Sequence, residues 1–333
     1  MDDIHISLAH GNGGRFMREL IDDIFVQHLD KAELDVQADA VPIDLNGGEA
    51  MITTDGFTVQ PLEFPGGDIG SLAVHGTVND LSVAGARPMY LTLNAFIEEG
   101  FEIAMLDRLV ASLAAAARTA GVRVSAGDTK VLRRGEGGGL YLATTGVGVR
   151  LPGPQLSMQS IRDGDRLLVT GSVGDHGTAI MLAREEFGLR GDILSDSAPV
   201  AALTETLLQF DGLKFMRDPT RGGLASVAHE LVRGTGLGVR LNAAIPVREQ
   251  VQSVCEMLGY DPLYLACEGR VVAIIAAAQA EAAVAACREL PGGSDAEIIG
   301  EMSANESRVI LATELGGERF LEELEDDPLP RIC

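Results

Sequence analysis

Residues 66–81 read GGDIGSLAVHGTVNDL, an apolar run with glycines and an aspartate before it and polar residues near its end. Asp68 can accept hydrogen bonds from the first N–H groups of a helix, so we predict a helix over Ile69–Leu81. His75 lies among apolar neighbours within this helix. A single histidine in that setting is usually a hydrogen-bonded core residue, and proton handling is the weaker alternative.

Three further strings in the first half place an aspartate beside flexible or terminal backbone. They are Thr53-Thr54-Asp55-Gly56 at a predicted strand end, Val78-Asn79-Asp80-Leu81 at the helix end, and Gly127-Asp128-Thr129-Lys130 after a predicted strand. Each string alone is typical of a turn or a helix cap. Together they favour a Mg²⁺–nucleotide site, because Mg²⁺ prefers oxygen ligands and commonly bridges carboxylates to phosphates. The sequence has no Walker A motif, so we do not expect a P-loop.

The second half carries two glycine-rich strings before predicted helices. In residues 218–223, DPTRGG, Arg221 and the glycines could hold an anion at the positive end of a helix, or form an ordinary helix start. Residues 171–177, GSVGDHG, place Asp175 in a similar position. Glu268 precedes an apolar strand, where it is either a base with a raised pKa or a solvated turn residue.

The rest of the chain alternates helical and extended patterns. Leu151-Pro152-Gly153-Pro154 follows a strand and is the best linker candidate, so we predict two α+β domains, residues 1–150 and 155–318. No Gly-x-Gly-x-x-Gly follows the first strand, which argues against a Rossmann domain. The predicted helices are residues 16–29, 69–81, 103–120, 177–186, 199–210, 223–233, 247–258 and 279–290. The predicted strands are residues 50–54, 57–59, 89–97, 122–126, 140–149, 166–170, 238–241, 270–276, 298–300 and 308–312.

Composition limits the possible partners. The 333 residues are 46% hydrophobic, enough for substantial cores, and the net charge of −23 repels nucleic acid and anionic membranes. A phosphate substrate would need a divalent cation. The four cysteines form no Cys-x-x-Cys pair and the N-terminus has no signal-peptide pattern, so we expect a cytoplasmic protein with reduced thiols.

The sequence ends Asp326-Asp327-Pro328-Leu329-Pro330-Arg331-Ile332-Cys333. Proline lacks the N–H and fixes φ, so this segment cannot continue a helix. We predict a mobile tail over residues 319–333 that carries the Cys333 thiol. A frayed end that happens to finish in cysteine is the alternative from these residues alone.

These strings together resemble the aminoimidazole-ribonucleotide synthetase (PurM-like) superfamily. The carrying motifs are Gly66–Gly70, Gly76–Leu81, Gly127–Lys130, Gly174–Gly177 and Arg217–Leu224. The ending Pro330-Arg331-Ile332-Cys333 resembles, within that superfamily, the HypE hydrogenase maturation factors. The likeness runs from His10 to Cys333.

The resemblance implies a two-domain fold in which two subunits pair their N-terminal sheets into a shared β-barrel, with ATP bound nearby. It implies a homodimer, a HypF-type carbamoyltransferase that loads a carbamoyl group on Cys333, and a HypC–HypD scaffold that receives the cyano group on iron. The activity implied is ATP-dependent dehydration of the thiocarboxamide to a thiocyanate, for the cyanide ligand of [NiFe]-hydrogenase.

The resemblance also implies residue roles. Cys333 carries the substrate, Glu268 is the candidate base, Lys130 neutralises phosphate charge or moves protons, and His75 is a weaker candidate for proton handling. The implied ATP and Mg²⁺ residues are Asp55, Asp68, Asn79, Asp80, Asp128, Thr129, Asp175, Asp218 and Arg221. Of these, Asp55, Asp80 and Asp128 are the expected Mg²⁺ ligands, by way of ATP.

One departure and two rival interpretations remain open. The family pattern commonly has Asn before the glutamate, whereas this chain has Cys267, either a small buried thiol or a partner for Cys333 on oxidation. Another synthetase or kinase of the superfamily would not need Cys333. A non-catalytic scaffold would not need Asp80 or Asp128.

Overall fold

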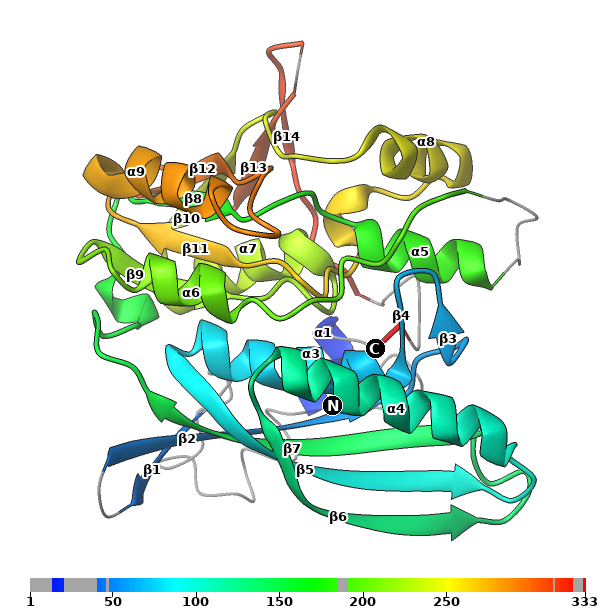
Figure 1. Ribbon diagram of the computed structural model, residues 1–333. Helices are drawn as coiled ribbons and strands as arrows, with labels where there is room; N and C mark the ends of the chain where they lie inside the picture. Colours follow the sequence, from blue (N-terminus) through cyan, green and yellow to red (C-terminus); the bar gives the residue numbers. More distant parts are fainter. Residues whose placement is uncertain (1–13, 21–40, 46–47, 185–190, 314, 326–331) are drawn as a thin grey trace.

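The computed structural model describes residues 14–20, 41–45, 48–184, 191–313, 315–325 and 332–333. Figure 1 shows two layers of structure, with one sheet and its helices above the other. Strands of residues 41–150 form the first sheet, and strands of residues 166–320 form the second. Within the described residues, no helix is both long enough and apolar enough to cross a membrane.

The N-terminal sheet has five strands in the order β1-β2-β7-β5-β6. Their bounds are β1 Val41–Leu45, β2 Gly48–Phe57, β5 Ala86–Glu98, β6 Arg123–Leu132 and β7 Leu140–Arg150. β5 and β6 are parallel and the other pairs are antiparallel. A short hairpin of β3 Glu63–Phe64 and β4 Gly67–Asp68 stands apart from this sheet. Helices α3 Ile69–Val83 and α4 Ile103–Thr119 pack on the sheet, α3 at β2, β5 and β7 and α4 at β6.

Helix α3 is buried on most sides, and most of its residues are apolar. The Asp68 side chain accepts from the Ser71 N–H at 2.9 Å, and the Ser71 hydroxyl accepts from the Asp68 N–H, which forms a capping box. The helix lies between the N-terminal sheet and the second domain (Figure 1). Both of its faces therefore exclude water, and polar residues on it must find protein partners.

The C-terminal domain has a seven-stranded sheet in the order β14-β13-β10-β12-β8-β11-β9. Its strands are β8 Arg166–Val169, β9 Leu213–Arg217, β10 Gly238–Leu241, β11 Val272–Ile275, β12 Glu297–Ser303, β13 Val309–Ala312 and β14 Glu318–Phe320. Its helices are α5 Asp175–Ala183, α6 Ala201–Leu207, α7 Gly223–Thr235, α8 Glu249–Leu258 and α9 Ala277–Arg288. Along β8, Leu168 packs with α6 and α9, while Leu167 and Val169 pack with α7. Successive side chains of a strand point to opposite faces of the sheet, so α6 and α9 lie on one face and α7 lies on the other.

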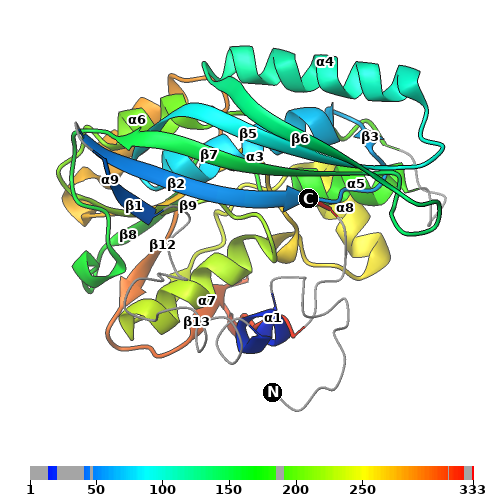
Figure 2. The ribbon, with the colours of Figure 1, turned by 90° about the horizontal axis from the view of Figure 1, so that it is seen from below.

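An apolar cluster joins the domains. It contains Leu72 and Val78 of α3, Ile180 of α5 and Val254 of α8, and it also includes Ile332 near the chain end. Helix α1, Arg15–Leu20, contacts the C-terminal segment. The N–H of Arg15, its first residue, donates a hydrogen bond to the Leu324 carbonyl. Figure 2 shows α1 beside the last described residues of this segment.

Most predicted helices and strands occur within a few residues of their predicted bounds. The predicted helix over residues 16–29 is described only as far as Leu20. One prediction was wrong: residues 127–130 do not follow a strand but lie inside β6, because their backbone continues to pair with β5. Thr53-Thr54-Asp55-Gly56 lies at the end of a strand as predicted, since β2 ends at Phe57.

Candidate active site at the domain junction

The end of the chain lies between the two domains (Figure 1). One main-chain carboxylate oxygen of Cys333 accepts from the Thr58 N–H at 3.0 Å and from the Thr58 hydroxyl at 3.2 Å. The Ile332 carbonyl lies 2.6 Å from Nε2 of His176, and the Ile332 side chain is 3% exposed. Burial of such a side chain contributes about 1.5–3 kcal/mol to docking of this segment. Of the predicted tail, residues 326–331 lie outside the described residues.

Three ionisable residues interact with the Cys333 thiol, namely Asp55, Arg221 and Glu268. Asp218 lies near Asp55 and Glu268. These four residues are called the junction cluster. Arg221 comes from the loop before α7, and its Nη2 lies 3.2 Å from Oδ1 of Asp55 in β2. Arg221 also hydrogen-bonds to the Cys333 side chain. Burial raises the pKa of the Cys333 thiol to about 12 despite Arg221, so the docked cysteine is a neutral thiol.

Glu268 is held by its backbone and leaves its carboxyl in the junction. Its N–H donates to Asp196 at 3.1 Å, and its carbonyl accepts from the Asn79 side chain at 2.9 Å. The residue is 3% exposed, and among the described residues its Oε1 has no hydrogen-bond partner. Burial, and then the neighbouring carboxylates of Asp218, Asp196 and Asp55, raise the pKa of Glu268 well above its ordinary value. Such a carboxyl is suited to exchange protons with a bound group.

Asp55 faces helix α3. Its Oδ2 is 3.8 Å from the position that a Cβ on Gly76 would occupy, an ordinary contact distance, whereas the Phe57 ring would lie only 2.9 Å from that Cβ. Burial raises the pKa of Asp55, and the ion pair with Arg221 opposes that shift. Asp218 accepts a hydrogen bond from the Thr220 hydroxyl just before α7. The sequence prediction that Asp55, Asp218, Arg221, Glu268 and Cys333 act together therefore agrees with their positions.

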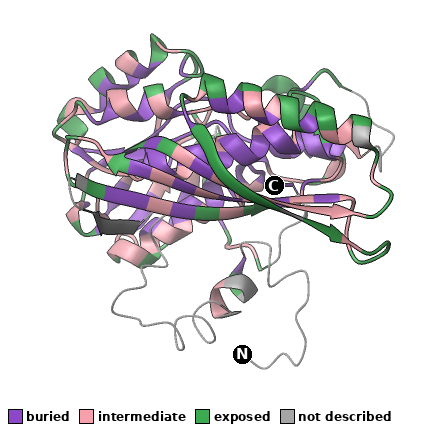
Figure 3. Cartoon of the chain, turned by 60° about the horizontal axis from the view of Figure 1, so that its bottom comes forward, coloured by how far each residue is buried: buried purple, intermediate pink, exposed green. Residues whose placement is uncertain are grey.

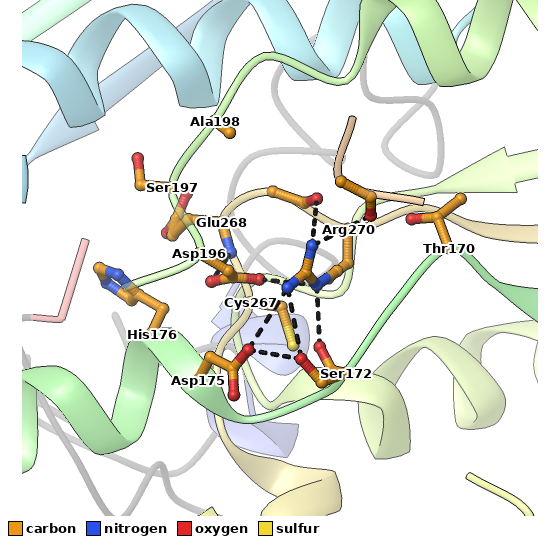
Figure 4. Close-up of polar contacts among 12 residues, drawn as sticks. Thr170, Ser172, Asp175, His176, Asp196, Ser197, Ala198, Cys267, Glu268 and Arg270 are labelled. Atoms are coloured by element: carbon orange, nitrogen blue, oxygen red, sulfur yellow. Dashed lines mark hydrogen bonds and ion pairs between the residues drawn. The ribbon is translucent and has the colours of Figure 1, made fainter. Parts of the chain in front are cut away.

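A buried network supports Glu268 from the C-terminal domain (Figure 4). Arg270 pairs with Asp175 and Asp196, each at 3.3 Å, and both carboxylates are fully buried. The Ser172 hydroxyl donates to Asp175 at 2.5 Å. Asp175, predicted as an ATP residue, is placed in this network. Asp196, which positions the Glu268 N–H, was missed by the sequence analysis.

Cys267 belongs to the same loop but faces the C-terminal core. Its sulfur accepts from the Gly174 N–H at 3.2 Å, and the side chain packs in the cluster around α7. Cys333 packs against a different cluster, the one that joins the domains. The environment of Cys267 is that of a small buried thiol.

Two predicted residues of α3 connect the domains. Asn79 donates to the carbonyls of Ala198 and Glu268 and accepts from the Val200 N–H. His75 lies 2.9 Å from the Ser197 hydroxyl, and burial lowers its pKa to about 4, so it is neutral near pH 7. Both side chains hold the segment that carries Ser197 and Val200 against the N-terminal domain.

The other predicted acidic residues of the first half lie in three settings. Asp68 caps α3, and Asp80 accepts from the Thr53 hydroxyl at 2.9 Å. Asp128 and Lys130 are on β6, an edge strand, where their charged groups are 2.6 Å apart and their side chains are 57% and 62% exposed. Thr129 is on the same strand, and its side chain lies outside the described residues. Figure 1 shows β6 at the outer edge of the N-terminal sheet, away from the chain end.

Two residues that hold the chain end were not predicted. Thr58 gave no signal in the sequence. His176 lies in the string Gly174-Asp175-His176-Gly177, in which only the aspartate was considered functional. Its fully buried position is set by α5, and the side chain points away from Arg270 in Figure 4.

The donors at the junction fit a nucleotide with Mg²⁺. Asp55 and Asp218 offer carboxylate oxygens, and the buried Oε1 of Glu268 has no hydrogen-bond partner among the described residues. In the part of the chain that the structure describes, no three or more His, Cys, Asp or Glu side chains are grouped to hold a metal ion. Mg²⁺ that binds together with a nucleotide is commonly held by one or two carboxylates, and phosphates and water complete its coordination.

Comparison with known proteins gives consistent matches over nearly the whole chain. The AIR synthase related protein, N-terminal domain, matches residues 37–150, and the corresponding C-terminal domain matches residues 162–312. "Carbamoyl dehydratase HypE" of Azotobacter vinelandii is 48% identical over 331 residues, covering 98% of this chain and 97% of the relative. The protein of that name from Escherichia coli (strain K12) is 41% identical over 335 residues, covering 99% of each.

Solved structures agree in fold. A structure described as a HypE–HypF complex aligns with a TM-score of 0.86 at 42% identity, covering 92% of this chain and 99% of the other. A structure of hydrogenase maturation protein HypE in complex with ATP aligns with a TM-score of 0.82 at 43% identity, covering 99% of this chain and 100% of the other. The family expected from the sequence motifs is confirmed.

Proposed function

The chain belongs to the AIR synthase related family and, within it, to the HypE carbamoyl dehydratases, and on this basis we propose that it dehydrates a carbamoyl group carried on its own Cys333. The product is a thiocyanate, which supplies the cyanide ligand during [NiFe]-hydrogenase maturation. The enzyme uses ATP, as the ATP complex of a close structural relative supports.

The observation that carries this proposal is the docked chain end. Cys333 lies among Arg221, Asp55 and Glu268, between two domains, although it is the last residue of the sequence. A cysteine that only ended a frayed terminus would not need a buried preceding residue or hydrogen bonds from Thr58. The docked geometry suits a substrate that the protein carries on its own chain.

The chemistry divides into activation and proton removal. The thiocarboxamide oxygen takes the γ-phosphoryl group of ATP, and ADP leaves. The nitrogen then loses two protons as phosphate departs with the oxygen, so that R–S–C(=O)–NH₂ and ATP become R–S–C≡N, ADP and phosphate. We assign Glu268 as an acceptor for nitrogen protons, because its carboxyl faces the sulfur region and has a raised pKa.

Arg221 and the acidic residues position the reacting groups. Arg221 touches the Cys333 side chain and Asp55, so it can orient the carbamoyl group on the sulfur. Asp55, Asp80 and Asp218 would hold Mg²⁺ together with the ATP phosphates. When bound, the cation supplies charge neutralisation to the transferring phosphoryl group.

The residues on β6 suggest how a homodimer would complete the site. β6 is an edge strand, and it exposes Val124 at 40% and Val131 at 71%. In Figure 3 the exposed residues are green, and much of the outermost strand of the N-terminal sheet has this colour. An edge with exposed valines favours pairing with a second sheet. In a shared barrel, Asp128 and Lys130 would reach the ATP site of the partner chain.

The carrier role requires the tail to leave the junction. Residues 326–333 span at most about 28 Å when extended. The segment before them is fixed, because His229 contacts the Leu321 carbonyl at 3.0 Å and the Tyr264 hydroxyl donates to the Glu322 carbonyl at 2.7 Å. A HypF-type carbamoyltransferase would load the thiol, and a HypC–HypD complex would receive the cyano group, within that reach in the cytoplasm.

The substitution Cys333→Ala tests the proposal most directly. We expect complete loss of carbamoyl loading and of thiocyanate formation, with a free energy of unfolding within about 1 kcal/mol of the parent chain. Intact-mass spectrometry measures both steps, since loading adds a carbamoyl group and dehydration removes one water. ATP turnover with a separate small substrate that survives Cys333→Ala would instead indicate another synthetase or kinase.

A further inference from the structure

The last two residues are held by groups outside the junction cluster. Thr58 donates twice to one main-chain carboxylate oxygen of Cys333, and His176 contacts the Ile332 carbonyl, while the Ile332 side chain is buried in the cluster that joins the domains. None of these contacts uses the sulfur atom of Cys333. Docking of the backbone is thus separable from the chemistry at the thiol.

The hydrogen bonds around His176 determine which ring nitrogen carries the proton. The Ile332 carbonyl can only accept, so Nε2 of His176 must donate across the 2.6 Å contact. Burial lowers the pKa of His176, so the ring is neutral and Nδ1 must accept. The Ser195 hydroxyl, 2.8 Å away, donates to Nδ1 and in turn accepts from the Ser197 N–H at 3.1 Å. The hydrogen bonds therefore run in one direction, from Ser197 to Ile332.

The ring is fixed on its other sides as well. The edge of the Phe64 ring meets the imidazole at 5.5 Å between centroids, at an interplanar angle of 86°. The Ser195 N–H donates to the Pro65 carbonyl at 2.8 Å, which holds the serine against the N-terminal domain. His176 comes from the C-terminal domain and Thr58 from the N-terminal domain, so the docked tail depends on both.

We propose that His176, aligned by Ser195, and Thr58 form a tail clamp that holds the Ile332 carbonyl and the main-chain carboxylate of Cys333. The clamp positions the sulfur beside the junction cluster whatever group the sulfur carries. The positioning of the loaded sulfur rests on the proposed function. The tail clamp makes His176 a positioning residue for the free thiol, the carbamoyl form and the thiocyanate alike, because it touches none of the atoms that change.

The tail clamp can be tested by the rate at which iodoacetamide alkylates Cys333 in the full-length chain. This measurement needs no enzymatic assay. A docked thiol with a pKa of about 12 reacts slowly, and an undocked thiol recovers ordinary reactivity. Loss of a hydrogen bond to a buried carbonyl should increase undocking, so we expect His176→Ala to raise the alkylation rate about tenfold or more. His176→Gln keeps an N–H donor and should recover part of the protection.

A matched control is available at His229. Its Nε2 contacts the Leu321 carbonyl at 3.0 Å, the same kind of bond to the same C-terminal segment, but before the residues that lead to the chain end. His229→Ala should leave Cys333 alkylation within about twofold of the parent chain. Equal rates for His176→Ala and His229→Ala would overturn the clamp.

His176 is fully buried, so its alanine variant could lose stability. Ser195→Ala and Thr58→Val provide milder tests, each removing one hydroxyl. Both should raise the alkylation rate by about threefold to tenfold with an unchanged melting temperature. If both variants stay folded and protect Cys333 as well as the parent chain does, the proposal is wrong.

The clamp also makes a prediction for catalysis that separates it from the proposed function. A chain loaded beforehand with the carbamoyl group should dehydrate about tenfold more slowly in Ser195→Ala, whereas loading by the carbamoyltransferase should not slow. Unchanged dehydration in a variant with exposed Cys333 would remove the positioning role and leave the function intact. Failure of the parent chain to dehydrate its carbamoyl group would instead contradict the proposed function and leave the alkylation result standing.

Discussion

The junction cluster and the edge strand β6 carry similar residues in opposite surroundings. At the junction, Glu268 is buried and its carboxyl lies near other carboxylates and Arg221. On β6, Asp128 and Lys130 pair with each other at 2.6 Å with more than half of each side chain exposed. Both regions were predicted to belong to one ATP site. Their separation within one chain implies that a second chain must bring them together if they share a site.

The largest expected effect concerns the junction side of this comparison. Glu268→Gln keeps the size of the side chain and removes its ability to accept a proton, so we expect dehydration to slow by about 10²–10⁴-fold. Carbamoyl loading should continue, because that step occurs on the undocked tail. Accumulation of the carbamoyl form by intact mass is the measurement, and Glu256→Gln on the exposed face of α8 is a matched control.

Dehydration at the normal rate in Glu268→Gln would exclude this carboxyl as the proton acceptor. The buried Asp196 and the junction residue Asp218 would then be the next candidates.

The edge strand gives a smaller but more specific effect. Lys130→Ala alone should slow dehydration by about tenfold to a hundredfold, since one cation near transferring phosphate is lost. Dimers that combine one Lys130→Ala chain with one Glu268→Gln chain should recover activity, because one of their two sites is then complete. In purified mixed dimers, the thiocyanate should form only on the chain that carries Lys130→Ala.

Intact mass distinguishes the two chains of a mixed dimer directly. Thiocyanate on neither chain would show that Lys130 acts in its own chain. A normal rate of dehydration in Lys130→Ala homodimers would show that Lys130 does not act at all. Either result would contradict the shared-site interpretation of β6.

The smallest effect concerns stability and His75, which is partly buried on α3 against Ser197. Its pKa is lowered from 6.5 to about 4 in the folded chain, so between these pH values the unfolded chain binds more protons. Stability must therefore fall as the pH drops from about 6.5 to 4, by about 1–3 kcal/mol after allowance for partial exposure. His75→Gln should flatten this part of the stability curve in denaturant titrations. An unchanged slope in this variant would mean that other groups account for the acid sensitivity.

Much of the fold could be predicted from local pattern. The helix over Ile69–Leu81 is confirmed as α3, with Asp68 as its cap, because capping and apolar periodicity are local properties. Strand ends were less predictable. Asp128 looked like a residue after a strand, since glycine and aspartate are rare in strands, yet pairing with β5 keeps it in the sheet. Asp55 was predicted at a strand end, and it lies near the end of β2.

The candidate site was predictable only in part. Cys333, Glu268, Arg221, Asp55 and Asp218 were selected from motifs, and the structure places them together. Asn79 was selected as a ligand residue, but its amide connects α3 to Ala198 and Glu268. A sequence motif cannot distinguish an Asn that binds a ligand from an Asn that bonds to the backbone. Only the packed neighbours show which hydrogen bonds the side chain makes.

The sequence by itself determined the family, the two α+β halves and the residue types that the chemistry needs. These depend on patterns within a few residues and on motifs that can be recognised without knowledge of the packing. Only the tertiary structure decided that Thr58 and His176 meet the chain end, and that Asp128 and Lys130 lie on a distant edge. Contacts between residues that are 275 positions apart, such as Thr58 with Cys333, depend on how two domains pack, and no local pattern specifies that.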